Sequence, residues 1–346
     1  MMKILVQIGH PAHVHFYKNF IWDFQSKGHQ VKILTKDKDI AIDLLEEYNF
    51  NYDVIFDQWN MTSFRGKIEY MKYEYATLRE LISFDPDAVT GIMAVALSHA
   101  AAITRTPSVI FGDTEHATLQ NTLSFPFADV VCTPDCYQKD IQGNHIRYPG
   151  YHELAYLHPN RFEPDDSVLD LIDASQDDSF VILRLVSWDA AHDTGDSGFS
   201  DVQDVVHKLE EAGSRVLLTS ETSLPAKLEP HRVQIPPHKM HDLMYYADLF
   251  LGESSTMAAE SAVLGTPAIF VSSSRRGYTD ELENKYGLVS NFSGPKRQVN
   301  GLEQALSILQ NYDRTKWNER RRELLKEKID TTSVISNQIE ARADFR

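Results

Sequence analysis

The stretch GESSTMAAESAVLGTPAIF, residues 252–270, combines a glycine turn, a hydroxyl-rich helix start and a short apolar run. Gly252 allows a close turn, and residues 254–256 place hydroxyls and backbone N–H groups at a helix N-terminus, where the helix dipole favours an anion. Glu260 lies about one helical turn after Thr256, where its carboxylate can accept hydrogen bonds from two neighbouring hydroxyls, as in a ribose. The alternative is an ordinary Ser/Thr cap followed by a surface glutamate. Residues 265–267, Gly-Thr-Pro, close the unit before the next apolar run and favour the ligand-binding interpretation.

The same alternation of apolar runs and helical periods extends to both sides of this stretch. In the C-terminal half, strands are predicted at residues 179–188, 214–220, 248–253 and 266–272, and helices at 200–213, 238–247, 254–265 and most of 301–341. Strands that alternate with helices in this way indicate a doubly wound parallel sheet.

The N-terminal half repeats this pattern. Strands are predicted at residues 3–8, 29–35, 51–56, 86–91, 107–111, 128–134 and 145–150, and helices at 14–27, 39–49, 66–84 and 94–104. Aromatic, proline and acidic residues then break every period over residues 148–166. We therefore predict an α/β protein with two Rossmann-like, doubly wound domains that face a central cleft. The domains are residues 1–150 and 151–346, and the last helix can pack back on the first domain.

Composition narrows the class of protein. The chain has 346 residues, 42% of them hydrophobic, and a net charge of −16, which argues against a nucleic-acid partner and an anionic membrane surface. No apolar run approaches the roughly 18 to 20 residues of a membrane helix, and no signal-peptide cleavage pattern follows the N-terminus. Cys132 and Cys136 alone cannot build a disulfide framework. We expect a cytoplasmic protein without a transmembrane segment; the sequence leaves its oligomeric state open.

Three histidines follow the first predicted strand, in the loop GHPAHVH of residues 9–15. Ligands of open parallel sheets bind at such strand ends. A zinc site would require three imidazoles within about 2.0 to 2.1 Å of one ion, but His13 and His15 are two positions apart and point to different faces of a helix. We therefore expect no metal. His10 is the best candidate for a base or phosphate contact, His13 is second, and His15 is expected to pack or lie on the surface.

A second group of titratable side chains follows another predicted strand, in the stretch GDTEH of residues 112–116. Asp113, Glu115 and His116 lie within four positions. Carboxylates that are close together or desolvated shift their pKa values and can serve in acid–base chemistry. The alternative is a loop of polar capping residues.

These motifs carry a resemblance to known families. Residues 252–270 resemble the nucleotide-sugar binding unit of GT-B glycosyltransferases and are similar to the corresponding unit of the non-hydrolysing UDP-N-acetylglucosamine 2-epimerases. The opening IGHPAHVHFYKNFIWDFQSKGHQVKILTKDKD, with VSWDAAHD and GDTEH, resembles more narrowly an uncharacterised prokaryotic group, the domain of unknown function family 354. The resemblance covers nearly the whole chain and implies a GT-B fold.

The resemblance also implies roles for individual residues. The donor diphosphate would be bound by Ser254, Ser255, Thr256 and Met257, and the ribose by Glu260. Arg184, Ser187 and Trp188 would contact a phosphate or stack on the base. The alternative for Arg184 is a buried structural ion pair. His192 falls where the epimerases have a histidine near the diphosphate. The base edge would meet His238, Met240 and His241, unless these residues only cap a helix. The epimerases carry an acid–base glutamate in the stretch that contains Asp113 and Glu115, but they also have an arginine in the first loop that this chain lacks.

Three functions remain open at this point. The first is metal-independent transfer of a sugar from a nucleotide-sugar donor, expected to be UDP-linked, with His10 or Asp113 as general base. The second is 2-epimerisation of a UDP-N-acetylhexosamine, with Asp113 and Glu115 shuttling protons. The third is a nucleotide-sugar-binding subunit without turnover. The nucleotide sugar is the substrate in the first two, and no further cofactor is expected. The acceptor would be a sugar or a lipid-linked molecule, and the aromatic residues of 63–78 are a hint of the latter unless they form an ordinary amphipathic helix.

Overall fold

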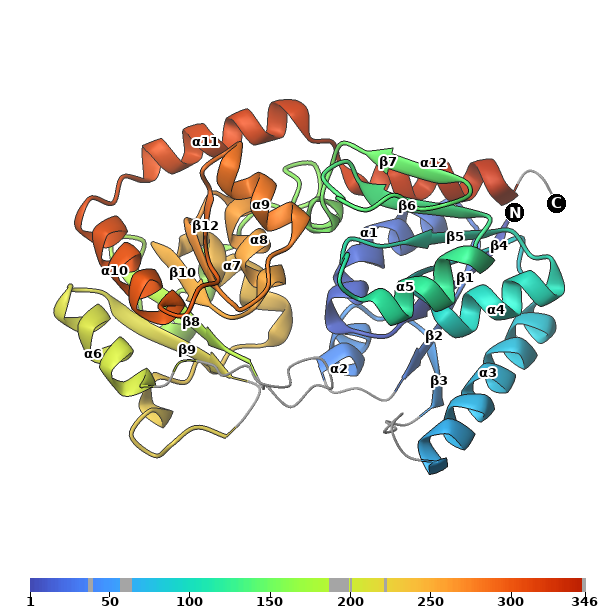
Figure 1. Ribbon diagram of the computed structural model, residues 1–346, viewed down its shortest axis with the longest axis horizontal. Coiled ribbons are helices and arrows are strands. Elements are labelled where there is room, and N and C mark those ends of the chain that lie inside the picture. Colours follow the sequence, from blue (N-terminus) through green and yellow to red (C-terminus); the bar gives the residue numbers. More distant parts are fainter. Residues whose placement is uncertain (37–39, 57–63, 187–198, 200, 221–222, 344–346) are drawn as a thin grey trace. The chain divides into compact units, whose positions relative to one another are not determined.

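A computed structural model describes residues 1–36, 40–56, 64–186, 199, 201–220 and 223–343 (Figure 1). The chain divides into two compact units. The first unit comprises Met1–Arg161 and Ile329–Arg346, and the second comprises Phe162–Lys328. None of the helices in the described ranges combines the length and apolar character that a bilayer span needs.

The first unit is built on a seven-stranded sheet with the order β3-β2-β1-β4-β5-β6-β7, in which every pair is parallel. The strands are β1 (Lys3–Ile8), β2 (Gln30–Lys36), β3 (Tyr52–Phe56), β4 (Ala88–Ile92), β5 (Ser108–Phe111), β6 (Val130–Pro134) and β7 (His145–Tyr148). The central strands are covered on both faces, so their sequences are unbroken apolar runs.

Helices cover the two faces of this sheet. Adjacent residues of a strand point to opposite faces. Val89 packs in the apolar cluster of α3 and α4, whereas the Thr90 hydroxyl lies 2.9 Å from the hydroxyl of Tyr17 on α1. One face therefore carries α3 (Phe64–Phe84), α4 (Val95–Thr104) and α5 (Thr118–Ser124). The other face carries α1 (Pro11–Ser26) with α2 (Ile40–Glu47) and α12 (Thr331–Ala343) packed beside it. Helix α5 lies in a stretch for which no element was predicted.

Residues 151–161 belong to the first unit, so this unit extends beyond the boundary predicted at residue 150. The backbone carbonyl of Ala155 accepts hydrogen bonds from the side chains of Asn19 on α1 and Thr332 on α12, at 2.8 and 2.7 Å. Arg161 forms ion pairs with Asp23 and Asp330. Tyr151 and Tyr156, which break the helical period here, are buried core residues, so this segment packs within the first unit although a domain junction was predicted for it.

The second unit is built on a five-stranded parallel sheet with the order β12-β11-β10-β8-β9. Its strands are β8 (Phe180–Leu185), β9 (Arg215–Ser220), β10 (Leu249–Gly252), β11 (Ala268–Val271) and β12 (Val289–Phe292). An apolar cluster joins the strands to α6 (Val202–Glu211) and α10 (Arg297–Gln310). Helix α8 (Ser255–Leu264) contacts α7 (Met240–Tyr246), α9 (Gly277–Asn284) and α11 (Arg314–Glu327).

The predicted α/β class with two Rossmann-like parallel sheets is confirmed. Helix α9 and strand β12, within residues 277–292, were not predicted from the sequence. Helix α9 has only eight residues, and β12 is an edge strand in which buried and half-buried side chains alternate. Neither element therefore has the long apolar run by which the other strands were recognised.

Candidate functional site

The strand order of the second unit reverses between β8 and β10, and ligands of open α/β sheets bind at such a reversal, beyond the strand ends. Gly252 pairs there with Arg184 in parallel register. A Cβ atom on residue 252 would lie 2.7 Å from Arg184 Cβ and 2.9 Å from its carbonyl oxygen. Only glycine therefore lets β10 turn into α8 at this point.

The predicted phosphate-binding residues form the start of α8. Ser254 is the N-cap, and its hydroxyl accepts a hydrogen bond of 3.3 Å from the Met257 N–H. Ser255 and Thr256 occupy the first turn and, like Ser254 and Met257, are half-buried. The first N–H groups of a helix have no partner within the helix, and this first turn contains no acidic side chain. The geometry suits an anion.

Glu260 is buried rather than exposed, with 5% of its surface accessible. Its Oε1 lies 3.0 Å from Nε2 of His241 on α7, and both side chains are almost fully enclosed. The predicted alternative of a surface glutamate is wrong, because α7 covers this face of α8. His238 and Met240, which were predicted near the base, lie half-buried at the start of α7.

Other predicted donor contacts lie near the end of β8. Arg184 is half-buried, and its carbonyl accepts a hydrogen bond of 3.2 Å from the Glu253 N–H. The buried Glu253 carboxylate, which the sequence reading did not single out, accepts hydrogen bonds from the N–H groups of Val186 and Phe199. Three predicted site residues lie outside the described residues: Ser187, Trp188 and His192.

The first unit has its own reversal, between β1 and β4, and the histidine loop follows β1. His10 is the exposed N-cap of α1, and its Nδ1 accepts a hydrogen bond of 3.2 Å from the Ala12 N–H. Nδ1 of the half-buried His13 accepts one of 3.2 Å from the Gly9 N–H. An Nδ1 that accepts carries no proton, so in the neutral ring Nε2 is a donor. Both imidazoles are thus suited to contact a phosphate or sugar oxygen.

His15 has a different environment. It is buried, its Nδ1 lies 3.3 Å from the Tyr48 hydroxyl, and its ring centre lies 5.4 Å from that of Tyr156. The side chain packs among aromatic rings of the first unit, in keeping with the packing role expected for it.

Asp113 follows β5, is half-buried, and pairs with the buried His152, a residue that was predicted to lie in the interdomain segment. Asp113 Oδ2 lies 3.1 Å from His152 Nδ1, and Asp113 Oδ1 accepts a hydrogen bond of 2.8 Å from Thr114. Burial by itself would raise the pKa of Asp113, but the charge and hydrogen bond of His152, then the Thr114 hydrogen bond and the charge of His13, lower this pKa to about 2. The carboxylate is ionised at neutral pH.

His152 is only 7% exposed, and its ring lies 4.5 Å from that of Phe16, measured between centres. Among the described residues, its buried Nε2 has no hydrogen-bond partner. No periodic pattern in the sequence connects residue 152 with residue 113. The only available signal was a histidine within an aromatic segment.

Glu115 makes hydrogen bonds of its own. The buried Glu115 carboxylate accepts a hydrogen bond of 3.2 Å from the Gln138 N–H, and its carbonyl accepts one of 2.7 Å from Lys139. Glu115 therefore fastens the loop after β6, whereas His116 is exposed. The expectation that the two carboxylates work side by side is not supported by this arrangement.

A cavity of about 520 Å³ opens at the carboxyl ends of β1, β2 and β4, within the first unit. It is lined by the β1–α1 loop, the end of β2, the turn from β4 to α4, and side chains of α3 and α5. His13 lies in its wall and also acts electrostatically on Asp113. The cavity therefore adjoins a predicted catalytic group.

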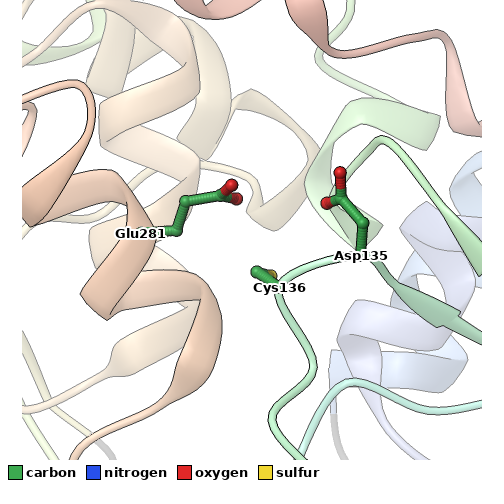
Figure 2. A group of neighbouring side chains, drawn as sticks. All are labelled: Asp135, Cys136 and Glu281. Carbon is green, nitrogen blue, oxygen red and sulfur yellow. The ribbon is translucent and has the colours of Figure 1, made fainter.

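Three side chains of metal-ligand type come from different units. Asp135 and Cys136 follow β6 in the first unit, and Glu281 lies on α9 in the second (Figure 2). These groups belong to separate units and are not a ligand set within either one. Over the described ranges, neither unit by itself brings together three His, Cys, Asp or Glu ligand atoms, and the histidines of residues 9–15 are no exception. Metal independence remains a prediction.

The chain belongs to the family described as protein of unknown function (DUF354), whose model matches residues 2–288. A curated relative, an uncharacterised protein of Methanocaldococcus jannaschii, is 23% identical over 282 residues, which cover 78% of this chain and 81% of the relative.

Solved structures also resemble the chain. The S. aureus protein MnaA, solved with UDP, aligns with a TM-score of 0.69 at 11% identity, covering 100% of this chain and 98% of MnaA. The UDP-GlcNAc 2-epimerase of Neisseria meningitidis, bound to UDP-GlcNAc, gives 0.65 at 14% identity over 98% of this chain and 100% of its own. The Streptomyces glycosyltransferase SsfS6 aligns with a TM-score of 0.61 at 13% identity, covering 97% of this chain and 100% of its own. At such identities the likeness concerns the fold alone, and the predicted GT-B class is confirmed.

Proposed function

We propose that this protein transfers a sugar from a nucleotide-sugar donor, with UDP as the carrier, to an acceptor bound by the first unit. The observation that carries the proposal is the start of α8. The close turn at Gly252, the hydroxyls of residues 254–256 and the N–H groups of the first turn suit a diphosphate, and Glu260 lies about one turn further along. Fold neighbours solved with UDP and UDP-GlcNAc support the choice of carrier.

In the reaction, the C–O bond between the anomeric carbon and the diphosphate breaks while the acceptor oxygen forms a new bond to that carbon. The acceptor loses a proton, and the departing UDP takes the bonding electrons as phosphate charge. N–H donors and the dipole at the start of α8 stabilise that charge, so this step does not require a metal ion.

We assign proton removal to His13 rather than to His10. His13 lies in the cavity wall, and its Nδ1 lone pair is engaged by a hydrogen bond of 3.2 Å, which an acceptor hydroxyl can replace. The ionised Asp113 favours the imidazolium that results. His10 is an exposed helix cap, suited to donate a hydrogen bond to the donor phosphate.

Epimerisation at C2 is the second candidate. It requires carboxyl groups that exchange protons near neutral pH, but the pKa of Asp113 is lowered to about 2 and the Glu115 carboxylate is engaged by the loop after β6. Both observations favour transfer. Incubating the protein with UDP-GlcNAc and following the sugar by NMR separates the functions. Epimer formation without an acceptor would replace the transfer proposal, whereas UDP release that depends on an acceptor supports it.

The ribose contact is tested with Glu260→Gln. The amide keeps the shape and a hydrogen bond toward His241 but loses the charge, so UDP should bind about 10- to 100-fold more weakly in isothermal titration. Glu260→Ala is unsuitable, because it leaves His241 buried without this partner and costs about 3 kcal/mol of stability or more. Unchanged UDP affinity in a folded Glu260→Gln protein would remove Glu260 from the site.

A further inference from the structure

The cavity of the first unit has one strongly apolar wall. Ile92 ends β4, Met93 follows it, Val95 begins α4, and Leu119 and Leu123 belong to α5. Leu119 is 59% exposed, although it is a large apolar side chain on a helix. Cavities of 300 to 1,000 Å³ with such walls are typical of sites that enclose the apolar part of a small molecule.

Another part of the wall is cationic. Lys36 ends β2, and its Nζ lies 4.9 Å from the centre of the Tyr73 ring. The Tyr73 hydroxyl accepts a hydrogen bond of 2.7 Å from the Gln7 amide, so the aromatic platform beneath the lysine is held in place. Lys36 and His13 are the basic residues of the lining, and the described lining contains no aspartate or glutamate.

The positive charge of this described lining contrasts with the net charge of the whole chain, which carries 50 acidic and 34 basic residues. The turn into α4 adds to the positive potential of the cavity, because Ala94, Val95 and Ala96 at the start of this helix line it. The N-cap Ala94 offers no side-chain hydrogen bond to the first N–H groups of the helix. A recess with one sign of charge and low-dielectric walls concentrates ligands of the opposite sign.

We infer that this cavity binds an acceptor that joins an apolar body to an anionic group, with the apolar part against α5 and the phosphate or carboxylate beside Lys36. The inference rests on the proposed function, since it names the acceptor class of that reaction. The donor diphosphate is assigned to α8 of the second unit, so the two anionic groups have separate sites. Binding energy comes from covering Leu119 and Leu123 and from a charge-assisted contact with the lysine.

Isothermal titration of the full chain with four probes below their micellar concentrations tests this inference: n-octyl phosphate, octanoate, n-octyl β-glucoside and inorganic phosphate. We expect octyl phosphate or octanoate to bind about tenfold or more tightly than both the neutral octyl probe and inorganic phosphate. The preferred anionic probe identifies the head group. Neutral octyl glucoside binding as tightly as both anionic probes would overturn the inference, and so would no binding by any octyl probe.

Variants locate the binding. Lys36→Met should weaken the preferred anionic probe about tenfold, whereas Lys67→Met, at an exposed position of α3 outside the lining, should not. Leu119→Gln should weaken every octyl probe, and Leu171→Gln, a leucine 52% exposed in the second unit, should not. Leu119 is a surface position, so this variant remains informative if Lys36→Met folds poorly. Equal affinity of wild type and Leu119→Gln would contradict the assignment.

UDP titrations keep this test separate from that of the proposed function. We expect UDP to bind the Lys36→Met and Leu119→Gln proteins as it binds the wild type. If octyl phosphate binds through Lys36 but UDP does not bind at all, the proposed function fails while the cavity assignment stands. If UDP binds and no octyl probe does, the acceptor inference fails alone.

Discussion

The Asp113–His152 pair makes folding depend on acidity. Asp113 has a pKa of about 2 in the folded chain and 3.8 as an isolated group, so it binds protons more weakly when folded. Its stabilisation is complete above pH 3.8 and is lost as the pH falls toward 2. The lowered pKa corresponds to a contribution of about 2 kcal/mol to the free energy of unfolding, of which about 1 kcal/mol should be lost by pH 3. Asp113→Asn lacks this titration, so urea unfolding at pH 6 and pH 3 should show a smaller loss of stability in the variant. Equal losses in both proteins would contradict the ion pair.

The three histidines of residues 9–15 should respond differently to replacement by asparagine. His13→Asn should reduce acceptor-dependent UDP release about 10²- to 10⁴-fold, because asparagine cannot take the proton. His10→Asn should have a smaller effect, seen mainly in donor binding. His15→Asn should leave turnover nearly intact and lower the thermal midpoint, because this ring is buried against Tyr156. Equal losses for all three variants, mimicked by a chelator and reversed by zinc, would indicate a metal site instead.

At the scale of elements, the turn between β10 and α8 should tolerate no side chain at position 252. A Cβ there would lie 2.7 Å from Arg184 Cβ, so Gly252→Ala should cost about 1 to 3 kcal/mol. Gly294→Ala is the matched control, because nothing lies within 4 Å of the added atom and the backbone is unstrained. Thermal unfolding of both variants checks this prediction. A stable Gly252→Ala protein would mean that β8 and β10 are further apart at this turn.

Sequence patterns predicted the elements that are long or fully buried. Strands β1, β8 and β10 were predicted from unbroken apolar runs. The start of α8 was predicted from its glycine and its hydroxyl side chains. The short α5 and α9 and the edge strand β12 lacked such signals. Within the site, Glu260 and His241 were both singled out, but His241 was predicted as a base contact or helix cap and not as the buried partner of Glu260. The pair depends on how α7 packs on α8, which the spacing of residues does not encode.

At the scale of the whole molecule, each of the two sheets has one point at which the strand order reverses. Ligands of open α/β sheets bind at such points. The second unit contains the start of α8, the proposed diphosphate site, and the first contains the cavity with His13 in its wall. Helix α12 returns the end of the chain to the first unit, where the hydroxyls of Thr331 and Thr332 donate to the carbonyls of Tyr151 and Ala155. Both ends of the second unit are therefore joined covalently to the first unit, which holds both the N-terminal and the C-terminal segments of the chain.

The central claim is that the start of α8 binds the diphosphate of a nucleotide, and Thr256→Glu tests it most directly. A glutamate in the first turn interacts favourably with the helix dipole, so stability should be kept or raised by about 0.3 to 1 kcal/mol, while the same charge repels the diphosphate. Thr315→Glu makes the same change in the first turn of α11 and is the matched control. Isothermal titration should show UDP binding at least about tenfold weaker in Thr256→Glu and unchanged in Thr315→Glu. Equal UDP affinity in the wild type and in a stable Thr256→Glu protein would contradict the claim.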